Sequence, residues 1–159
     1  MTDAYRVAPR EGDSPWVRQA AAATGFFSPA EVEVAVELVD DWIAKGSRSD
    51  YRFLFLESDG MRSGYACYGP IACTISSHDL YWIVVHPDFQ RFGLGRKIMA
   101  EVESRVRAEG GTRIYADTSG RPQYEPTRSF YERSGFEVAA RLTDFYAPGD
   151  DKVIYVRKL

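Results

Sequence analysis

The sequence is poor in the side chains that build disulfides and metal sites. Among 159 residues it has two cysteines, Cys67 and Cys73, and two histidines, His78 and His86. The cysteines have no nearby histidine pair at zinc spacing, and the histidines have no partners at metal spacing. We therefore expect packed thiols in a reducing compartment, histidines at a turn and at the surface, and no bound metal.

Long apolar runs are also missing. No stretch reaches the roughly 18 consecutive apolar residues of a membrane-spanning helix. Residues 1–6 lack the apolar core of a secretory signal, and no repeat or low-complexity segment interrupts the chain. These absences predict a cytoplasmic protein with no membrane partner.

A strong charge of either sign is absent as well. The 20 basic and 23 acidic side chains leave a formal net charge of -3. No broad basic surface therefore favours nucleic acid as a partner. The length and the hydrophobic fraction of 45% fit one globular domain over residues 1–159.

Two helix-start signals stand near the beginning of the chain. Asp13-Ser14-Pro15 precedes a predicted helix over 16–24. Ser28-Pro29-Ala30-Glu31 repeats the signal, and apolar residues at helical spacing continue the second helix to Lys45, where Gly46 ends it.

From residue 50 the pattern changes to the alternating or continuous apolar character of strands. Strands are predicted over 51–57, 62–68, 78–85, 113–118, 136–141 and 153–157, besides a short first strand over 5–8. Ser58-Asp59-Gly60 predicts a hairpin turn, whereas 142–152 is predicted to be a long loop. Further helices are predicted up to Gly110-Gly111 and over 126–134, so 78–85 and 113–118 form a crossover unit and run parallel.

The most informative segment is the glycine turn Gln90-Arg91-Phe92-Gly93-Leu94-Gly95-Arg96, which follows an apolar strand and opens an amphipathic helix. Its two glycines let the backbone approach a ligand, and the first N–H groups of the helix have no internal partners. With the side chains of Arg91, Arg96 and Lys97, these donors favour a phosphate or pyrophosphate. The alternative is a turn needed only for packing.

Two motifs carry a family resemblance. Gln-x-x-Gly-x-Gly follows a Val-Val-His-Pro strand end, and Phe130-Tyr131-Glu132-Arg133-Ser134-Gly135-Phe136 comes later. In this order they resemble the GNAT superfamily of N-acetyltransferases, over residues 51–159. Val85-His86-Pro87-Asp88-Phe89-Gln90-Arg91 followed by Gly-Leu-Gly-Arg is most similar to the ribosomal-protein alanine acetyltransferases. The resemblance implies an α/β fold: a mixed, mostly antiparallel central sheet with a splayed parallel strand pair, flanked by about four helices.

The resemblance also implies acetyl-CoA as the co-substrate. Its pantetheine arm would enter where the two parallel strands splay apart and pair with the backbone of Ile83, Val84 and Val85. Its pyrophosphate would rest on backbone N–H groups of Arg91, Phe92, Gly93, Leu94, Gly95 and Arg96. Tyr124 stands where the family often has an asparagine that contacts the cofactor arm, so it is a further candidate. Its alternative role is packing within a loop.

Two residues are candidates for acid–base chemistry. Tyr131 occupies the position of the family's general acid, which protonates the leaving thiolate. A packed core tyrosine is the alternative. Asp117 lies near the place where a glutamate acts as base in the alanine acetyltransferases, and a turn former or ion-pair partner is the alternative. Glu125 and Asp144 are weaker competitors for the base.

These expectations combine into an N-acetyltransferase that passes an acetyl group directly from acetyl-CoA to a primary amine of a small molecule or peptide. No cysteine or serine has a neighbouring base motif, which disfavours a covalent acetyl-enzyme. Phe145, Tyr146 and Asp150 would recognise the acceptor, unless their segment forms only a Pro-Gly turn. The alternative function is a non-catalytic acyl-CoA-binding or sensing module. The oligomeric state is open, with a homodimer as one arrangement.

Overall fold

The chain divides into two units that share three elements: strand β3 (Met61–Pro70), strand β4 (Ser77–Val85) and helix α3 (Leu94–Ala108). The computed structural model describes all residues from 1 to 159. The first unit comprises Met1–Gly69 and Trp82–Val102, and the second comprises Pro70–Tyr81 and Glu103–Leu159.

The first unit is built on an antiparallel hairpin. The elements that lie before β4 are β1 (Asp3–Arg6), α1 (Asp13–Ala23), α2 (Pro29–Lys45), a short 3-10 turn (Gly46–Arg48), β2 (Arg52–Ser58) and β3 (Met61–Pro70). Strands β2 and β3 pair with Ser58 opposite Met61, and β1 pairs with β2. The two residues between β2 and β3, Asp59 and Gly60, both have positive φ, as a tight hairpin turn requires. This confirms the predicted hairpin.

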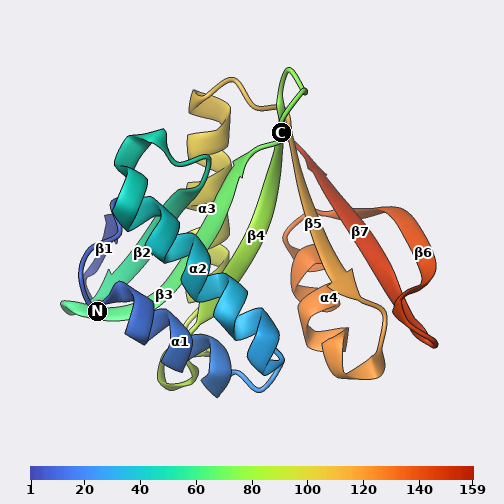
Figure 1. The fold of residues 1–159 in the computed structure, drawn as a ribbon, viewed down its shortest axis with the longest axis horizontal. Coiled ribbons are helices and arrows are strands. Elements are labelled where there is room, and N and C mark those ends of the chain that lie inside the picture. Colours follow the sequence, from blue (N-terminus) through green and yellow to red (C-terminus); the bar gives the residue numbers. More distant parts are fainter. The chain divides into compact units, whose positions relative to one another are not determined.

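Side chains of β2 and β3 alternate between two faces, because successive residues of a strand point to opposite sides. Figure 1 shows α1 and α2 side by side in front of these strands. A core cluster joins the helices to this face and contains Val17, Ala20, Ala35, Val36, Val39, Phe53, Phe55, Tyr65, Cys67 and Val84. Burial of this apolar surface is therefore what holds the helix pair on the sheet.

The other face of β3 meets α3 at Gly64. A Cβ atom at Gly64 would lie 2.8 Å from the carbonyl oxygen of Val84 and 2.8 Å from Ile98 Cδ1. Only glycine leaves room for such a close approach of the backbone of β4. Gly64 therefore allows the end of β4 to pack closely against β3.

Helix α2 begins and ends where the sequence predicts. Ser28 and Glu31 form a capping box, Pro29 opens the helix, and Gly46 follows its last residue with φ 60.

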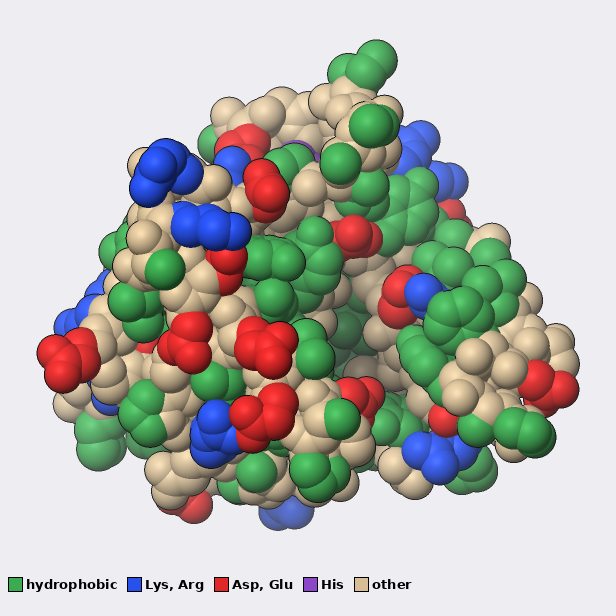
Figure 2. All heavy atoms as spheres, viewed as in Figure 1, with side chains coloured by type: hydrophobic (Ala, Val, Ile, Leu, Met, Phe, Trp, Pro, Cys, Tyr) green, Lys and Arg blue, Asp and Glu red, His purple; other side chains and the backbone are tan.

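On the face shown in Figure 2, acidic side chains gather over α2, whose exposed residues include Glu31, Glu33, Glu37 and Asp40. None of the helices is long and apolar enough to cross a membrane.

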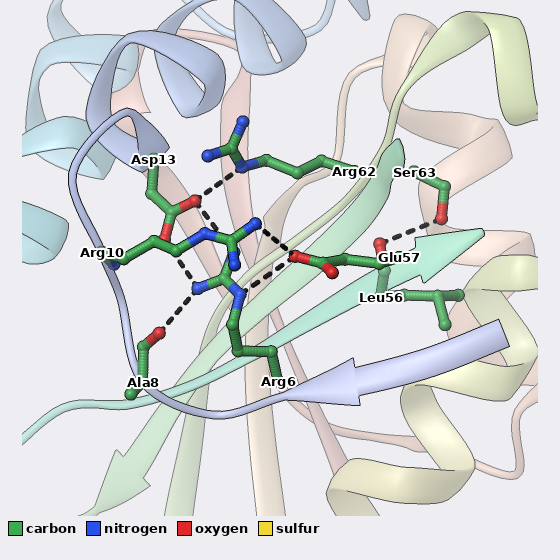
Figure 3. Close-up of polar contacts among 8 residues, drawn as sticks. All are labelled: Arg6, Ala8, Arg10, Asp13, Leu56, Glu57, Arg62 and Ser63. Atoms are coloured by element: carbon green, nitrogen blue, oxygen red, sulfur yellow. Dashed lines mark hydrogen bonds and ion pairs between the residues drawn. The ribbon is translucent and has the colours of Figure 1, made fainter. Parts of the chain in front are cut away.

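The start of α1 differs from the prediction. The residue before the helix is Gly12, and Asp13 lies in the first turn with no exposed surface. The Asp13 carboxylate accepts hydrogen bonds from Arg6 Nη1 and Nη2, from Arg62 Nε and from the Arg10 backbone N–H, at 2.7–2.9 Å. Figure 3 shows these donors converging, with Glu57 bridging Arg6 and Arg10. Asp13 is thus a buried anchor between α1, β1 and β3.

The second unit is a three-stranded antiparallel arrangement extended by the start of β4. It contains β5 (Arg113–Ser119), a short 3-10 turn (Pro122–Tyr124), α4 (Glu125–Arg133), β6 (Glu137–Ala147) and β7 (Asp150–Lys158). Strand β7 pairs with both β5 and β6, and β4 pairs with β5 in parallel. The hydrogen-bonded strand order is β1-β2-β3-β4-β5-β7-β6. The predicted fold class, a mostly antiparallel mixed sheet with one parallel pair and four helices, is confirmed.

The predicted loop over 142–152 is wrong. Strands β6 and β7 extend through it and pair down to Ala147 opposite Asp150, so only Pro148 and Gly149 form the turn. Gly149 has φ 79, and proline followed by such a glycine is the pattern of a type II turn. The sequence did not indicate a strand in this segment because it contains polar residues, which a strand as exposed as β6 can accommodate.

The buried ion cluster predicts a large loss of stability on Asp13→Ala. Removing this carboxylate leaves the partly buried charge of Arg62 without a partner and that of Arg6 with Glu57 alone, which costs about 3–5 kcal/mol. The measurement is the free energy of unfolding in urea. Glu33→Gln is the matched control, since the exposed Arg18–Glu33 pair is worth about 0–1 kcal/mol. Equal losses in the two variants would contradict the anchoring role of Asp13.

Candidate active site

The glycine turn between β4 and α3 has an unusual backbone. A short 3-10 turn (Pro87–Phe89) follows β4, and α3 begins at Leu94. Between them, Arg91 has φ 71 and Gly93 has φ 73. Left-handed residues that alternate with ordinary ones turn successive N–H groups toward one concave side, which makes an anion-binding nest.

The N–H groups of this turn have no partners in the protein. The first backbone hydrogen bond of α3 runs from the Lys97 N–H to the Gly93 carbonyl at 3.2 Å, and none is made by the N–H groups from Arg91 to Arg96. A Cβ atom at Gly93 would meet nothing within 4 Å, so the turn is open to a ligand. Free donors at a helix N-terminus suit a pyrophosphate. The predicted cofactor residues therefore fit such a group.

The side chains around this turn are only partly as predicted. Arg91 and Arg96 are exposed and extend from the turn. Lys97 is not available, because its ammonium pairs with Asp3 of β1 at 2.5 Å. Phe92 is also exposed, while Leu94 is buried and holds the start of α3 in place.

Strand β4 offers backbone groups for an extended ligand. Its parallel register with β5 covers only Ser77–Asp79 against Arg113–Tyr115, so the rest of β4 is unpaired on that edge. The predicted pantetheine contacts Ile83, Val84 and Val85 lie in this unpaired part. The Val84 side chain is buried in the core, which fixes the strand and leaves main-chain atoms for recognition.

Tyr131 lies on α4 in the second unit and is buried. Its ring packs against Phe136 and Tyr155, with centroids 5.3 and 5.5 Å away. Its hydroxyl makes no hydrogen bond within the protein. Burial raises the pKa of Tyr131, and the negative charge of Asp117 adds to this effect. The hydroxyl therefore stays protonated and can act as a donor.

Asp117 lies on the opposite side of β5 from Tyr131. Tyr155, which packs on Tyr131, stands opposite Ala116 in the sheet, and the next residue of a strand points to the other face. The Asp117 carboxylate pairs with Lys152 at 2.7 Å and is 43% exposed. Of the weaker candidates, Glu125 pairs with Arg128, and Asp144 accepts a hydrogen bond from the Gly149 N–H within the hairpin.

A second carboxylate, Asp79, lies on the same face as Asp117. Asp79 stands opposite Tyr115 in the parallel register, two residues before Asp117 on β5. It is half-buried, and burial followed by the charge of Asp117 raises its pKa, with Lys152 acting in the opposite direction. A carboxyl group with such a raised pKa beside a like charge is typical of functional sites. Asp79 was missed in the sequence, because only the pairing of β4 with β5 brings it near Asp117.

The remaining predicted site residues are engaged in local structure. Tyr124 ends a 3-10 turn, half-buried, with the Arg121 guanidinium 6.0 Å from its ring centre. Asp150 is buried, accepts a hydrogen bond from the Ser119 hydroxyl and pairs with Arg121. Phe145 and Tyr146 are about half exposed, and the Lys152 ammonium lies 4.6 Å from the Phe145 ring centre.

Both histidines have structural partners. His86 precedes the 3-10 turn, as predicted, and its Nδ1 accepts the Asp88 N–H. His78 was expected at the surface, but it is buried and lies 3.4 Å from Glu109, because the end of α3 and Gly111 pack over it. No cluster of three or more metal-binding side chains occurs in the chain.

The sequence matches the acetyltransferase (GNAT) family over residues 18–136. The chain belongs to the GNAT acetyltransferase family. A solved structure from Desulfovibrio desulfuricans, provisionally assigned as a GNAT acetyltransferase, is 46% identical to this enzyme. The two superpose with a TM-score of 0.96, over 99% of each chain.

Two further acetyltransferases share the fold. The ribosomal-protein-S18-alanine N-acetyltransferase from Escherichia coli is 17% identical, with a TM-score of 0.74 over 99% of this chain and 94% of that one. YncA from Salmonella typhimurium, solved with its cofactor acetyl-CoA, is 18% identical. Its TM-score is 0.74, over 100% of this chain and 95% of that one. These identities show a common fold alone. No curated protein matches the sequence.

The geometry of the glycine turn predicts a selective effect of Gly93→Ala on ligand binding. A side chain at φ 73 costs about 1–2 kcal/mol, and the backbone relieves that strain by rotating the N–H groups out of the nest. We expect coenzyme A to bind about tenfold more weakly, as measured by isothermal titration calorimetry.

Gly110→Ala is the matched control, because Gly110 has φ 81 and no atom near its Cβ position but lies at the other end of α3. It should lower the melting temperature about as much as Gly93→Ala while leaving the affinity for coenzyme A unchanged. A similar loss of affinity in both variants would show that strain alone, and not the nest, explains the effect.

Proposed function

We propose that this enzyme transfers an acetyl group from acetyl-CoA directly to a primary amine. The observation that carries the proposal is the row of free N–H groups from Arg91 to Arg96, directly after the unpaired end of β4. The row suits a pyrophosphate, and the unpaired strand suits the amides of a pantetheine arm. Because both contacts use the main chain, they place the thioester by backbone geometry.

The acetyl carbonyl needs a hydrogen-bond donor when its oxygen becomes negative. A backbone N–H of the unpaired part of β4, near Val85, serves as this donor in our proposal. The donor is held rigid, because Val84 is anchored in the core and the His86 N–H bonds to the Ser63 carbonyl at 2.9 Å. A fixed donor loses no energy to reorganisation during the reaction.

Tyr131 is the proposed proton donor to the sulfur. When the amine nitrogen bonds to the carbonyl carbon, the carbon–sulfur bond breaks and the thiolate must be protonated. Burial that raises the pKa of a tyrosine also raises the pKa of a thiol, as it does for Cys67 in the first unit. Burial beside Tyr131 would likewise favour the protonated form of the leaving sulfur, which assists transfer of the Tyr131 proton.

The amine must lose a proton before or during its attack. Asp117 was the sequence candidate for this base, but its carboxylate is engaged in an ion pair with Lys152 at 2.7 Å. Asp79, with its raised pKa, is the better choice. We propose that Asp79 takes the proton, directly or through water, and that Asp117 raises its basicity by charge repulsion.

The role of Tyr131 predicts the behaviour of Tyr131→Phe. Loss of the hydroxyl should lower the rate of thiol release from acetyl-CoA by about tenfold or more, measured against a panel of amines and peptides. Binding of coenzyme A should be retained, because the ring still packs against Phe136 and Tyr155.

Tyr155→Phe is the control for Tyr131→Phe, since it also removes a buried hydroxyl, one bonded to Glu132 at 3.1 Å. It should lower stability by about 1 kcal/mol and leave the rate close to that of wild type. If wild type binds acetyl-CoA but acetylates nothing in a broad panel, the sensing function replaces the catalytic one.

The two carboxylates predict different pH profiles for their Asn variants. Asp79 accepts a proton only when ionised, so the rate of wild type falls as the pH drops through its raised pKa. Asp79→Asn should abolish this acid limb and lower kcat by about 100-fold or more. Asp117→Asn should keep the limb but move it to lower pH, because removing the neighbouring negative charge lowers the pKa of Asp79. A limb lost in Asp117→Asn and kept in Asp79→Asn would reverse the assignment.

A further inference from the structure

The first unit contains a cavity that the proposed acetyl transfer does not use. Its volume is about 400 Å³, and its lining residues are Trp16, Gly60, Met61, Arg62, His86 and Phe89. Small-molecule sites in proteins usually measure about 300–1,000 Å³. The cavity is therefore large enough for a ligand of one ring with a short substituent.

Three rings form the apolar wall of this cavity. The His86 ring lies between the other two, with its centroid 6.5 Å from that of Trp16 and 6.3 Å from that of Phe89. Trp16 is fixed from behind by edge contacts with Phe55 and Tyr65. Such a preformed aromatic wall binds a flat apolar ligand at little entropic cost.

Arg62 supplies the polar edge of the cavity. Its Nε donates to the buried Asp13 carboxylate at 2.7 Å, which fixes the plane of the guanidinium. Its two terminal nitrogens make no hydrogen bond to the protein. A planar fork of free N–H groups in a fixed orientation suits a carboxylate, which it can bind through two parallel hydrogen bonds.

The charge balance favours an anion at Arg62. The ion cluster of Figure 3 has a net charge of +1. It contains three arginines and two carboxylates, which are Arg6, Arg10, Arg62, Asp13 and Glu57. No acidic residue lines the cavity. The unbalanced charge is therefore available to a ligand.

His86 adds a second donor. Its Nδ1 accepts the Asp88 backbone N–H at 3.2 Å, which leaves Nε2 to donate. The ring is 18% exposed, and its Nε2–H makes no hydrogen bond within the protein. Both polar side chains of the cavity thus present donors, which a carboxylate satisfies and an amine does not.

We propose that this cavity is a binding site for a small aromatic carboxylate. The carboxylate lies on the terminal nitrogens of Arg62, and the aromatic ring packs against the wall formed by Trp16, His86 and Phe89. The site stands apart from the proposed acetyl-transfer chemistry, since none of its lining residues belongs to that machinery. The lining residues that lie nearest in sequence to the pyrophosphate nest are His86 and Phe89, in the turn after β4.

The test is binding of phenylacetate to the full-length enzyme, with phenylacetamide as the uncharged analogue. The three tryptophans give separate indole N–H signals in NMR, which single Trp→Phe variants assign. Phenylacetate should shift the Trp16 signal and leave those of Trp42 and Trp82 in place. Phenylacetamide should bind roughly tenfold or more weakly, because it lacks the charge that strengthens the bonds to Arg62.

Variants locate the site. Arg62→Gln should reduce the affinity for phenylacetate to that for phenylacetamide, whereas Arg10→Gln, in the same ion cluster but outside the cavity, should leave it unchanged. Phe89→Ala removes a ring of the wall without touching the ion cluster and should weaken both probes. Equal affinity for the two probes, an unmoved Trp16 signal, or equal losses in Arg62→Gln and Arg10→Gln would overturn the proposal.

Discussion

One buried carboxylate organises the first unit. Asp13 has no contact with solvent, and a carboxylate is tolerated there only when charged donors surround it. Its donors come from β1 and β3, so the ends of both strands and the first turn of α1 are fixed together. Because Trp16 follows within the same helix, this interaction also sets one wall of the cavity beside Arg62.

The proposed cofactor site depends on backbone geometry more than on side chains. Two residues with positive φ, Arg91 and Gly93, turn the N–H groups before α3 outward. The short register between β4 and β5 leaves the end of β4 without a strand partner. A site made of main-chain donors tolerates changes of side chain, because the backbone supplies its N–H groups whatever the side chains are.

In the second unit, burial turns ordinary side chains into candidates for acid–base chemistry. Tyr131 is buried against two aromatic rings on one face of β5, whereas Asp79 and Asp117 share the other face. Desolvation disfavours the charged form of each buried group and raises the pKa of both Tyr131 and Asp79. Strand β5 thus lies between the proposed proton donor, Tyr131, and the proposed proton acceptor, Asp79.

The sequence by itself determined the local structure and the family. The capping box of α2, the hairpin turn at Gly60 and the glycine turn at Gly93 follow from backbone preferences that act over a few residues. Tertiary structure alone decided which distant residues meet: Lys97 pairs with Asp3, and Asp79 lies near Asp117. The reason is physical, because local sequence sets φ and ψ, whereas strand pairing and burial bring together charges that lie far apart in the chain.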